Sequence, residues 1–81
     1  MTVHCRFFAR YAEVAGREAL DLDVPRGATV AQAVDALRVM LRAGAQLPAR
    51  PLVAVNREHA ALDRVLVDGD ELALLPPLAG G

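Results

Sequence analysis

The sequence has a single cysteine, Cys5, and contains no lysine and no serine. One cysteine excludes an internal disulfide and any zinc or iron–sulfur site built from several cysteines. The absence of lysine excludes Schiff-base chemistry and a lysine nucleophile, and it means that the chain cannot be modified on lysines of its own. All nine basic residues are arginines, the net charge is −1, and no basic stripe is present. A nucleic-acid partner is therefore not expected.

Long hydrophobic runs are missing as well. No apolar run approaches the ~20 residues of a membrane-spanning helix, and the sequence shows no signal-peptide pattern. We therefore expect a soluble, cytoplasmic protein with no membrane contact. The chain is nevertheless 54% apolar, with a mean hydropathy of +0.28, which is too apolar for a disordered protein. Its 81 residues predict one domain.

The usual catalytic and metal-binding constellations are also absent. Cys5, His4 and His59 do not combine into a nucleophile, a base and an orienting group, and there is no glycine-rich phosphate loop. Asp68-Gly69-Asp70 lacks the further ligands of a calcium loop, so the acidic residues around it indicate a solvated turn. We predict neither an active site nor a metal site within the chain. The acidic residues in question are Asp63, Asp68, Asp70 and Glu71.

Two segments of the N-terminal half alternate between apolar and polar residues, as half-buried strands do. Thr2–Phe8 is the first segment, with Cys5 on the core face and His4 on the opposite face. A thiol buried in the core contributes to packing and is chemically unreactive. His4 has no evident acidic partner and is expected at the surface. Ala19–Val24 is the second segment. The connection between them is short, so we expect an antiparallel hairpin.

Two helices are predicted. Ala9–Ala15 is typical of a short helix ended by Gly16. Thr29 followed by Gln32 forms a capping box that begins a longer helix, which we expect to run to about Ala43 and to end at Gly44. An apolar stripe at helical spacing would face the core; it comprises Val30, Ala33, Val34, Leu37, Met40 and Leu41.

Three further segments of the C-terminal half are predicted strands. Leu52–Val55 is nearly continuously apolar, which favours a central position, and His59–Leu62 is a short edge segment. Asp68-Gly69-Asp70 indicates a tight turn that leads into the last strand, Glu71–Leu75. Leu72 and Leu74 would lie on one face of that strand, and Ala73 and Leu75 on the other.

One long helix on a small mixed sheet of four or five strands is an α+β architecture. We expect the first and last strands side by side in the middle of the sheet, and one sheet face left uncovered by the chain. Residues 1–75 would form the domain and residues 76–81 an extended C-terminal tail. Leu75, Pro76 and Leu78 would then be exposed together, and such an apolar patch is typical of a protein interface.

The tail itself is a stiff base with a slim tip. Pro76 and Pro77 hold the chain extended, whereas Gly80 and Gly81 remove every side chain around the terminal carboxylate. Six residues reach about 20 Å, so the tip could enter a narrow channel. A carboxylate is a poor electrophile until one oxygen becomes a leaving group. Chemistry at Gly81 therefore requires an activating partner enzyme.

Four segments resemble one family. The chain resembles the small subunit of molybdopterin synthase, a ubiquitin-like sulfur carrier with a β-grasp fold. The C-terminal run, with its acidic turn, strand, double proline and terminal Gly80-Gly81, is the most specific of them. Family members often carry phenylalanine where Leu74 and Leu75 stand here, which affects the partner surface. The matching segments are Phe7-Phe8-Ala9-Arg10 with Glu13 and Gly16, Ala28-Thr29-Val30, Val53-Ala54-Val55-Asn56 and residues 66–81.

The resemblance implies a mechanism and two partners. An ATP-dependent adenylating enzyme, related to ubiquitin-activating enzymes, would adenylate Gly81, and sulfur would replace the adenylate to leave a thiocarboxylate. The tail would then insert into the large synthase subunit, where sulfur passes to a cyclic pterin precursor. The chain would be a non-catalytic, sulfur-donating subunit of this sulfurtransferase with no bound cofactor, and the catalytic residues would lie on the large subunit. Implied tail-threading residues are Gly80, Ala79 and Leu78, and implied partner-binding residues are Leu75, Pro76, Pro77 and Phe8.

Three other functions remain open at the level of the sequence. A sulfur carrier for another pathway, such as thiamine thiazole synthesis, would use the same chemistry at Gly81, although the double proline favours the molybdopterin role. A ubiquitin-like protein modifier would instead join Gly81 to a lysine of its target. In a plain interaction domain the terminal glycines would be incidental.

Overall fold

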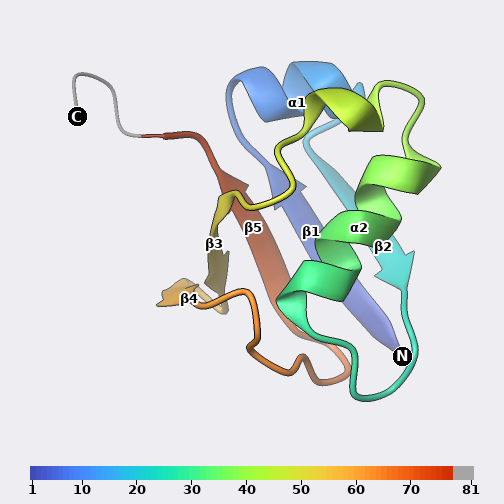
Figure 1. The fold of residues 1–81 in the computed structure, drawn as a ribbon, viewed down its shortest axis with the longest axis vertical. Coiled ribbons are helices and arrows are strands. Elements are labelled where there is room, and N and C mark those ends of the chain that lie inside the picture. The colour runs from blue at the N-terminus through green and yellow to red at the C-terminus, as the bar shows by residue number, and fades with distance from the viewer. Residues whose placement is uncertain (78–81) are drawn as a thin grey trace.

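The computed structural model describes residues 1–77, which form a five-stranded mixed sheet covered on one face by a helix (Figure 1). The order of the strands is β2-β1-β5-β3-β4, so the predicted α+β architecture is confirmed. In chain order the elements are β1 (Thr2–Phe7), α1 (Arg10–Ala15), β2 (Ala19–Asp23), α2 (Val30–Met40), the 3-10 helix η1 (Gly44–Gln46), β3 (Leu52–Val55), β4 (Glu58–Ala60) and β5 (Glu71–Leu75).

The pairing of the strands confirms most of the expected topology. β1 and β2 form the antiparallel hairpin, and β1 runs parallel to β5 beside it. β3 lies antiparallel to β5 on the other side, so β1 and β5 lie side by side in the interior of the sheet as predicted, and β3 also has a neighbour on each side, as its apolar character indicated. β4 is the edge strand, joined to β3 through Asn56 and Arg57, whose φ angles of 51° and 70° make a two-residue hairpin turn.

The long helix begins as predicted and ends earlier. The Thr29 side chain accepts from the backbone N–H of Gln32, and the Gln32 side chain accepts from that of Thr29, so the capping box is complete. The helix ends at Met40, not Ala43, because Leu41 already has extended backbone angles. Met40 was predicted to belong to the apolar stripe that faces the core. It is instead 54% exposed, so this prediction was wrong.

Gly44 has a different role from the helix cap that the sequence suggested. A Cβ placed on Gly44 would lie 2.3 Å from the carbonyl oxygen of Arg38. The chain therefore folds back against the last turn of α2 at a distance that only glycine permits. The Arg38 Nε also donates to the carbonyl of Leu47, at 2.8 Å, which holds η1 against the helix.

The core lies between α2 and the sheet face that it covers. Val3, Cys5 and Phe7 of β1 point into it, together with Leu72 and Leu74 of β5, as their alternation predicted. α1 and η1 lie at the end of the sheet toward which β1 and β5 run (Figure 1). The helix side chains that complete this core are Val30, Ala33, Val34 and Leu37.

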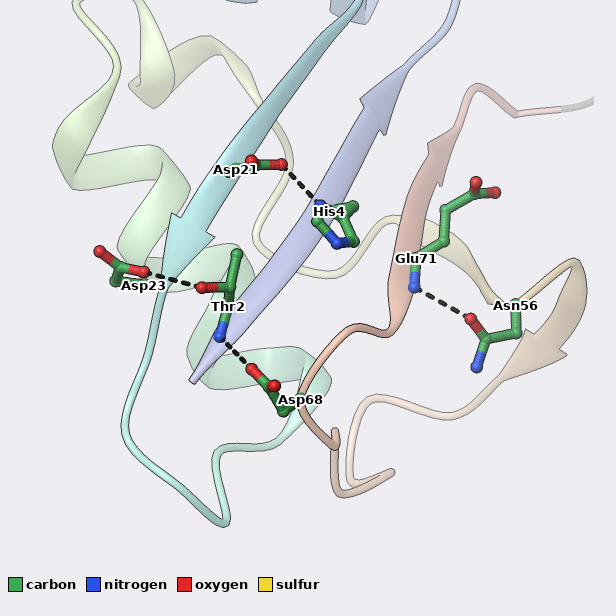
Figure 2. A network of polar contacts seen from close by, with 7 residues as sticks. All are labelled: Thr2, His4, Asp21, Asp23, Asn56, Asp68 and Glu71. Atoms are coloured by element: carbon green, nitrogen blue, oxygen red, sulfur yellow. Dashed lines mark hydrogen bonds and ion pairs between the residues drawn. The ribbon is translucent and has the colours of Figure 1, made fainter.

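The acidic turn before β5 is partly structural, which corrects the prediction of a solvated loop. Asp70 is only 6% exposed. Its carboxylate accepts from Asn56 Nδ2 at 2.9 Å and from the backbone N–H of Val67 at 2.8 Å. Asn56 Oδ1 in turn accepts from the backbone N–H of Glu71 (Figure 2). Buried polar groups need such partners, and these bonds tie the start of β5 to the β3–β4 turn.

Candidate functional site

The site begins where β5 ends. β5 is paired on both sides, to β1 and to β3, so the direction in which the chain leaves the sheet is set by two ladders of hydrogen bonds. Pro76 follows directly and is partly buried, and Pro77 is exposed. The remaining predicted site residues, Leu78, Ala79, Gly80 and Gly81, lie outside the described residues.

An apolar row crosses the sheet beside this exit. We call the sheet face that α2 leaves uncovered the open face. Leu75 on this face pairs with Leu52 of β3, and Phe8 continues β1 beyond the pair formed by Phe7 and Leu74. Phe8 is 39% and Leu52 is 50% exposed, which is unusual for large apolar side chains. The structure thus places the predicted Phe8 and Leu75 together and adds Leu52.

A shallow hollow of about 370 Å³ lies next to the apolar row. Its floor is made by Ala73 of β5 and Ala54 of β3, which are cross-strand partners. Both alanines are more than nine-tenths buried, although no helix covers this face of the sheet. They are buried because larger side chains surround them on all sides of the hollow. The surrounding residues are Arg6, Phe8, Arg57, His59, Glu71 and Leu75.

Arginine and aromatic groups meet at one wall of the hollow. The guanidinium carbon of Arg6 lies 5.4 Å from the centre of the Phe8 ring, within the range of a cation–π contact. This contact favours one orientation of an otherwise exposed arginine. Sequence reasoning missed Arg6, Ala54, Ala73 and Arg57. The available signals were the alternation that places Arg6 on the polar side of the first strand, and the expected position of Ala73 on the same face as Leu75.

The end of the open face near the start of β1 is polar, in contrast to the end near the tail. His4 Nδ1 lies 2.6 Å from Asp21 Oδ1, and the Thr2 hydroxyl donates to Asp23 (Figure 2). The hydrogen bond to Asp21, and then the negative charge of that residue, raise the pKa of His4 above 6.5. The prediction that His4 has no acidic partner was wrong, because the β1–β2 register places Asp21 directly opposite it.

The described residues hold no catalytic constellation. Cys5 is fully buried, and its burial raises the pKa of the thiol to about 12, so the reactive thiolate is suppressed. Residues 1–77 contain no cluster of three or more side chains suited to hold a metal ion. Over the same residues, no helix has both the length and the apolar character needed to cross a membrane. What distinguishes the site is its row of exposed apolar side chains and the Pro76-Pro77 segment that leaves the sheet beside it.

The fold and this exit define a ubiquitin-like carrier class, and the comparison with known families agrees. The ThiS family model matches residues 5–81, so the chain belongs to the ThiS family. The predicted β-grasp fold and the predicted resemblance to ubiquitin-like sulfur carriers are thereby confirmed.

Curated relatives fall into two functional groups. Small archaeal modifier protein 1 of Haloferax volcanii is 42% identical, over 94% of this chain and 97% of its own length. The molybdopterin synthase sulfur carrier subunit of Escherichia coli is 35% identical, over 93% of this chain and 94% of its own length. The chain is therefore similar over nearly its whole length to a protein modifier and to a sulfur carrier.

Solved structures show the same two groups. The crystal structure of the Haloferax volcanii modifier superposes with a TM-score of 0.83 at 38% identity and covers 100% of both chains. A chain of the complex of subunits 1 and 2 of molybdopterin-converting factor from Helicobacter pylori superposes with a TM-score of 0.67 at 26% identity, again over 100% of both chains.

Proposed function

We propose that the protein is the sulfur-carrier small subunit of molybdopterin synthase. The observation that carries the proposal is the exit of the chain from β5: the doubly paired central strand aims the Pro76-Pro77 stem away from the sheet, beside exposed apolar side chains. The similarity to several molybdopterin synthase sulfur carrier subunits supports it. A carrier needs a rigid body, a docking surface and a reactive end, and it needs no catalytic residues of its own.

The proposed chemistry takes place on Gly81. An adenylating enzyme joins the AMP part of ATP to the Gly81 carboxylate and releases pyrophosphate. Sulfur at the oxidation level of sulfide, supplied by a donor, then attacks the acyl carbon and displaces AMP, which leaves the thiocarboxylate. The large synthase subunit receives the tail and supplies the catalytic groups that move this sulfur to a cyclic pterin precursor. Because activation consumes ATP, we place the reaction in the cytoplasm.

Docking in this proposal uses the end of the open face nearest the tail. Phe8 and Leu75 contact the partner, and Pro76 and Pro77 guide Leu78, Ala79 and Gly80 into its channel. The similarity to one chain of a complex of two molybdopterin-converting factor subunits supports a large-subunit partner. The adenylating enzyme binds the same surface at an earlier step, since both partners must reach Gly81.

A second function, protein modification, is favoured by the 42% identity to small archaeal modifier protein 1. In this role the activated Gly81 forms an isopeptide bond with a lysine of a target protein. Because the 81 residues include no lysine, the chain cannot receive a further copy on a lysine. A modifier of this sequence would therefore be attached in single copies or through its amino terminus.

A tandem mass spectrum of the C-terminal peptide, from protein purified from its native cells, separates the candidates. Sulfur located on Gly81 is the expected result. The fragment spectrum is needed because the intact mass is ambiguous. Replacing one oxygen by sulfur at Gly81 increases the mass by nearly the same amount as adding one oxygen to Met1, Met40 or Cys5. Gly81 in isopeptide linkage to a lysine would establish the modifier role instead.

Deletion of Gly81 provides the genetic test of the proposal. The variant should keep its fold, because residues 1–77 contain the entire described core, and it should lose all molybdopterin formation. Unimpaired molybdopterin formation by this variant would refute the proposed role in molybdopterin synthesis. Loss of sulfur loading without loss of molybdopterin would assign the carrier to another sulfur pathway.

A further inference from the structure

The hollow on the open face has a defined chemical character. Across the sheet, Arg6 of β1 pairs with Ala73, Ala73 pairs with Ala54, and Ala54 pairs with His59 of β4. Four strands thus contribute one row in which two small side chains lie between two large polar ones. On the tail side this row is bordered by the apolar Phe8 and Leu75.

We propose that this hollow receives one large apolar side chain, aromatic or leucine-like, from the large synthase subunit, with a carboxylate of the same segment beside it. The inference rests on the proposed function and adds to it a recognition element distinct from the tail. Its position next to Leu75, the last residue of β5, means that an occupied hollow would fix the body of the carrier where the tail begins.

Size and lining support an apolar occupant. A hollow of about 370 Å³ with two alanines as its floor is large enough for one aromatic or leucine side chain. Contact with the faces of Phe8 and Leu75 removes apolar surface from water, which is the main favourable term in such an interface. Anchors of this kind, set into a pocket of the facing protein, carry most of the binding energy in many complexes.

Charge supports the neighbouring carboxylate. Arg6 and Arg57 line the hollow, against the single acid Glu71, so its lining has a net positive charge. A guanidinium binds a carboxylate through two parallel hydrogen bonds, and Arg6 is already oriented by its contact with the Phe8 ring. The polar end of the open face, with Asp21 and Asp23, would repel the same carboxylate if the partner bound in another register.

The test uses isothermal titration calorimetry of the full 81-residue chain with the molybdopterin synthase large subunit from the same organism. Ala73→Leu fills the hollow from its floor, and we expect it to raise Kd about tenfold or more. Ala19→Leu is the matched control, since Ala19 lies on the same face and pairs with Arg6 from the other side, outside the hollow. It should leave Kd within about twofold.

A charge-reversal pair keeps the test valid if Ala73→Leu fails to fold. Arg6→Glu changes an exposed side chain and should weaken binding most at low ionic strength, because the partner carboxylate is then repelled. Arg64→Glu makes the same change at an exposed position that does not line the hollow, and it should have no comparable effect. A merely structural role of Arg6 would give a loss that does not depend on salt.

The possible results separate the inference from the proposed function. Equal binding by folded Ala73→Leu and the native chain would overturn the inference and leave the carrier function standing. If the native chain does not bind the large subunit at all, the proposed function fails, and the inference fails with it. Self-association of the native chain that Ala73→Leu abolishes would identify a second copy as the occupant, contrary to the proposal.

Discussion

Replacing Asp70 by alanine should destabilise the fold strongly, although the sequence presents this residue as one more acid in a polar turn. Asp70 is 6% exposed, and each of its carboxylate oxygens accepts a hydrogen bond, one from Asn56 Nδ2 and one from the backbone of Val67. Asp70→Ala leaves both donors without this partner. Asn56 also accepts from the backbone of Glu71, so the loss loosens the β3–β4 turn from the start of β5.

The magnitude follows from the two bonds. A hydrogen bond to a charged group contributes about 1.5–3 kcal/mol, and a donor left in a partly buried position recovers some of that from water. We therefore expect Asp70→Ala to lower the free energy of unfolding by about 2–4 kcal/mol. A domain of this size has a total stability of about 4–12 kcal/mol. At the middle of both ranges, about 8 kcal/mol less about 3 kcal/mol, the variant remains folded with a melting temperature about 10–20 °C lower.

The assay is urea unfolding followed by far-ultraviolet circular dichroism, since the chain has no tryptophan. The midpoint should fall while the m-value stays unchanged, because the surface exposed on unfolding is the same. Asp70→Asn keeps one accepting oxygen and should lose about half as much stability. Asp63→Ala is the matched control, since Asp63 is an exposed acid of the preceding loop.

Two results would refute this reasoning. One is an Asp70→Ala variant whose stability lies within about 0.5 kcal/mol of the native chain, the range of an ordinary surface substitution. The other is an equal loss in Asp63→Ala, which would mean that net charge, and not the buried hydrogen bonds of Asp70, stabilises this region.

Three further predictions concern single residues. Gly44→Ala should lower stability by about 1–3 kcal/mol, measured by thermal unfolding, because the new Cβ meets the Arg38 carbonyl at 2.3 Å; an unchanged melting temperature would contradict this. Cys5, with its pKa raised to about 12, should resist iodoacetamide at mildly alkaline pH until the chain is unfolded, and rapid labelling of the native protein would count against its burial. The pKa of His4, followed by NMR, should lie above 6.5 and return toward that value in Asp21→Asn. The stabilising contribution of the His4–Asp21 pair should be fully present below pH 6.5 and be lost as the pH rises through the raised pKa of the folded state.

Much of the architecture could be predicted from local patterns. The alternation of Thr2–Phe8 gave β1 and its buried face, and the capping box at Thr29 and Gln32 gave the start of α2. The end of α2 could not be read in the same way. Gly44 suggested a helix cap, but its close approach to the Arg38 backbone involves a loop whose path depends on tertiary packing.

The candidate site was predicted only in part. Phe8 and Leu75 follow from the resemblance and from the exposed phase of the last strand, and the structure places both at one hollow. Arg6, Ala54 and Ala73 gave no individual signal, since each is an ordinary residue of a strand. They become a site only because β1, β5 and β3 lie side by side in one register.

By itself, the sequence determined the order of the main strands and helices, the apolar face of most of them, and that the chain has no lysine and a Gly80-Gly81 end. These properties depend on residues only a few positions apart in the sequence, so they can be predicted without knowledge of the tertiary structure. Tertiary structure alone decided that Asp70 is buried, that His4 has an acidic partner, and that an alanine-floored hollow lies beside the exit of the tail. Asp70 is buried because its turn packs against Asn56 of the β3–β4 turn. The other two depend on the register between strands, and a shift of one residue would send those side chains to the other face.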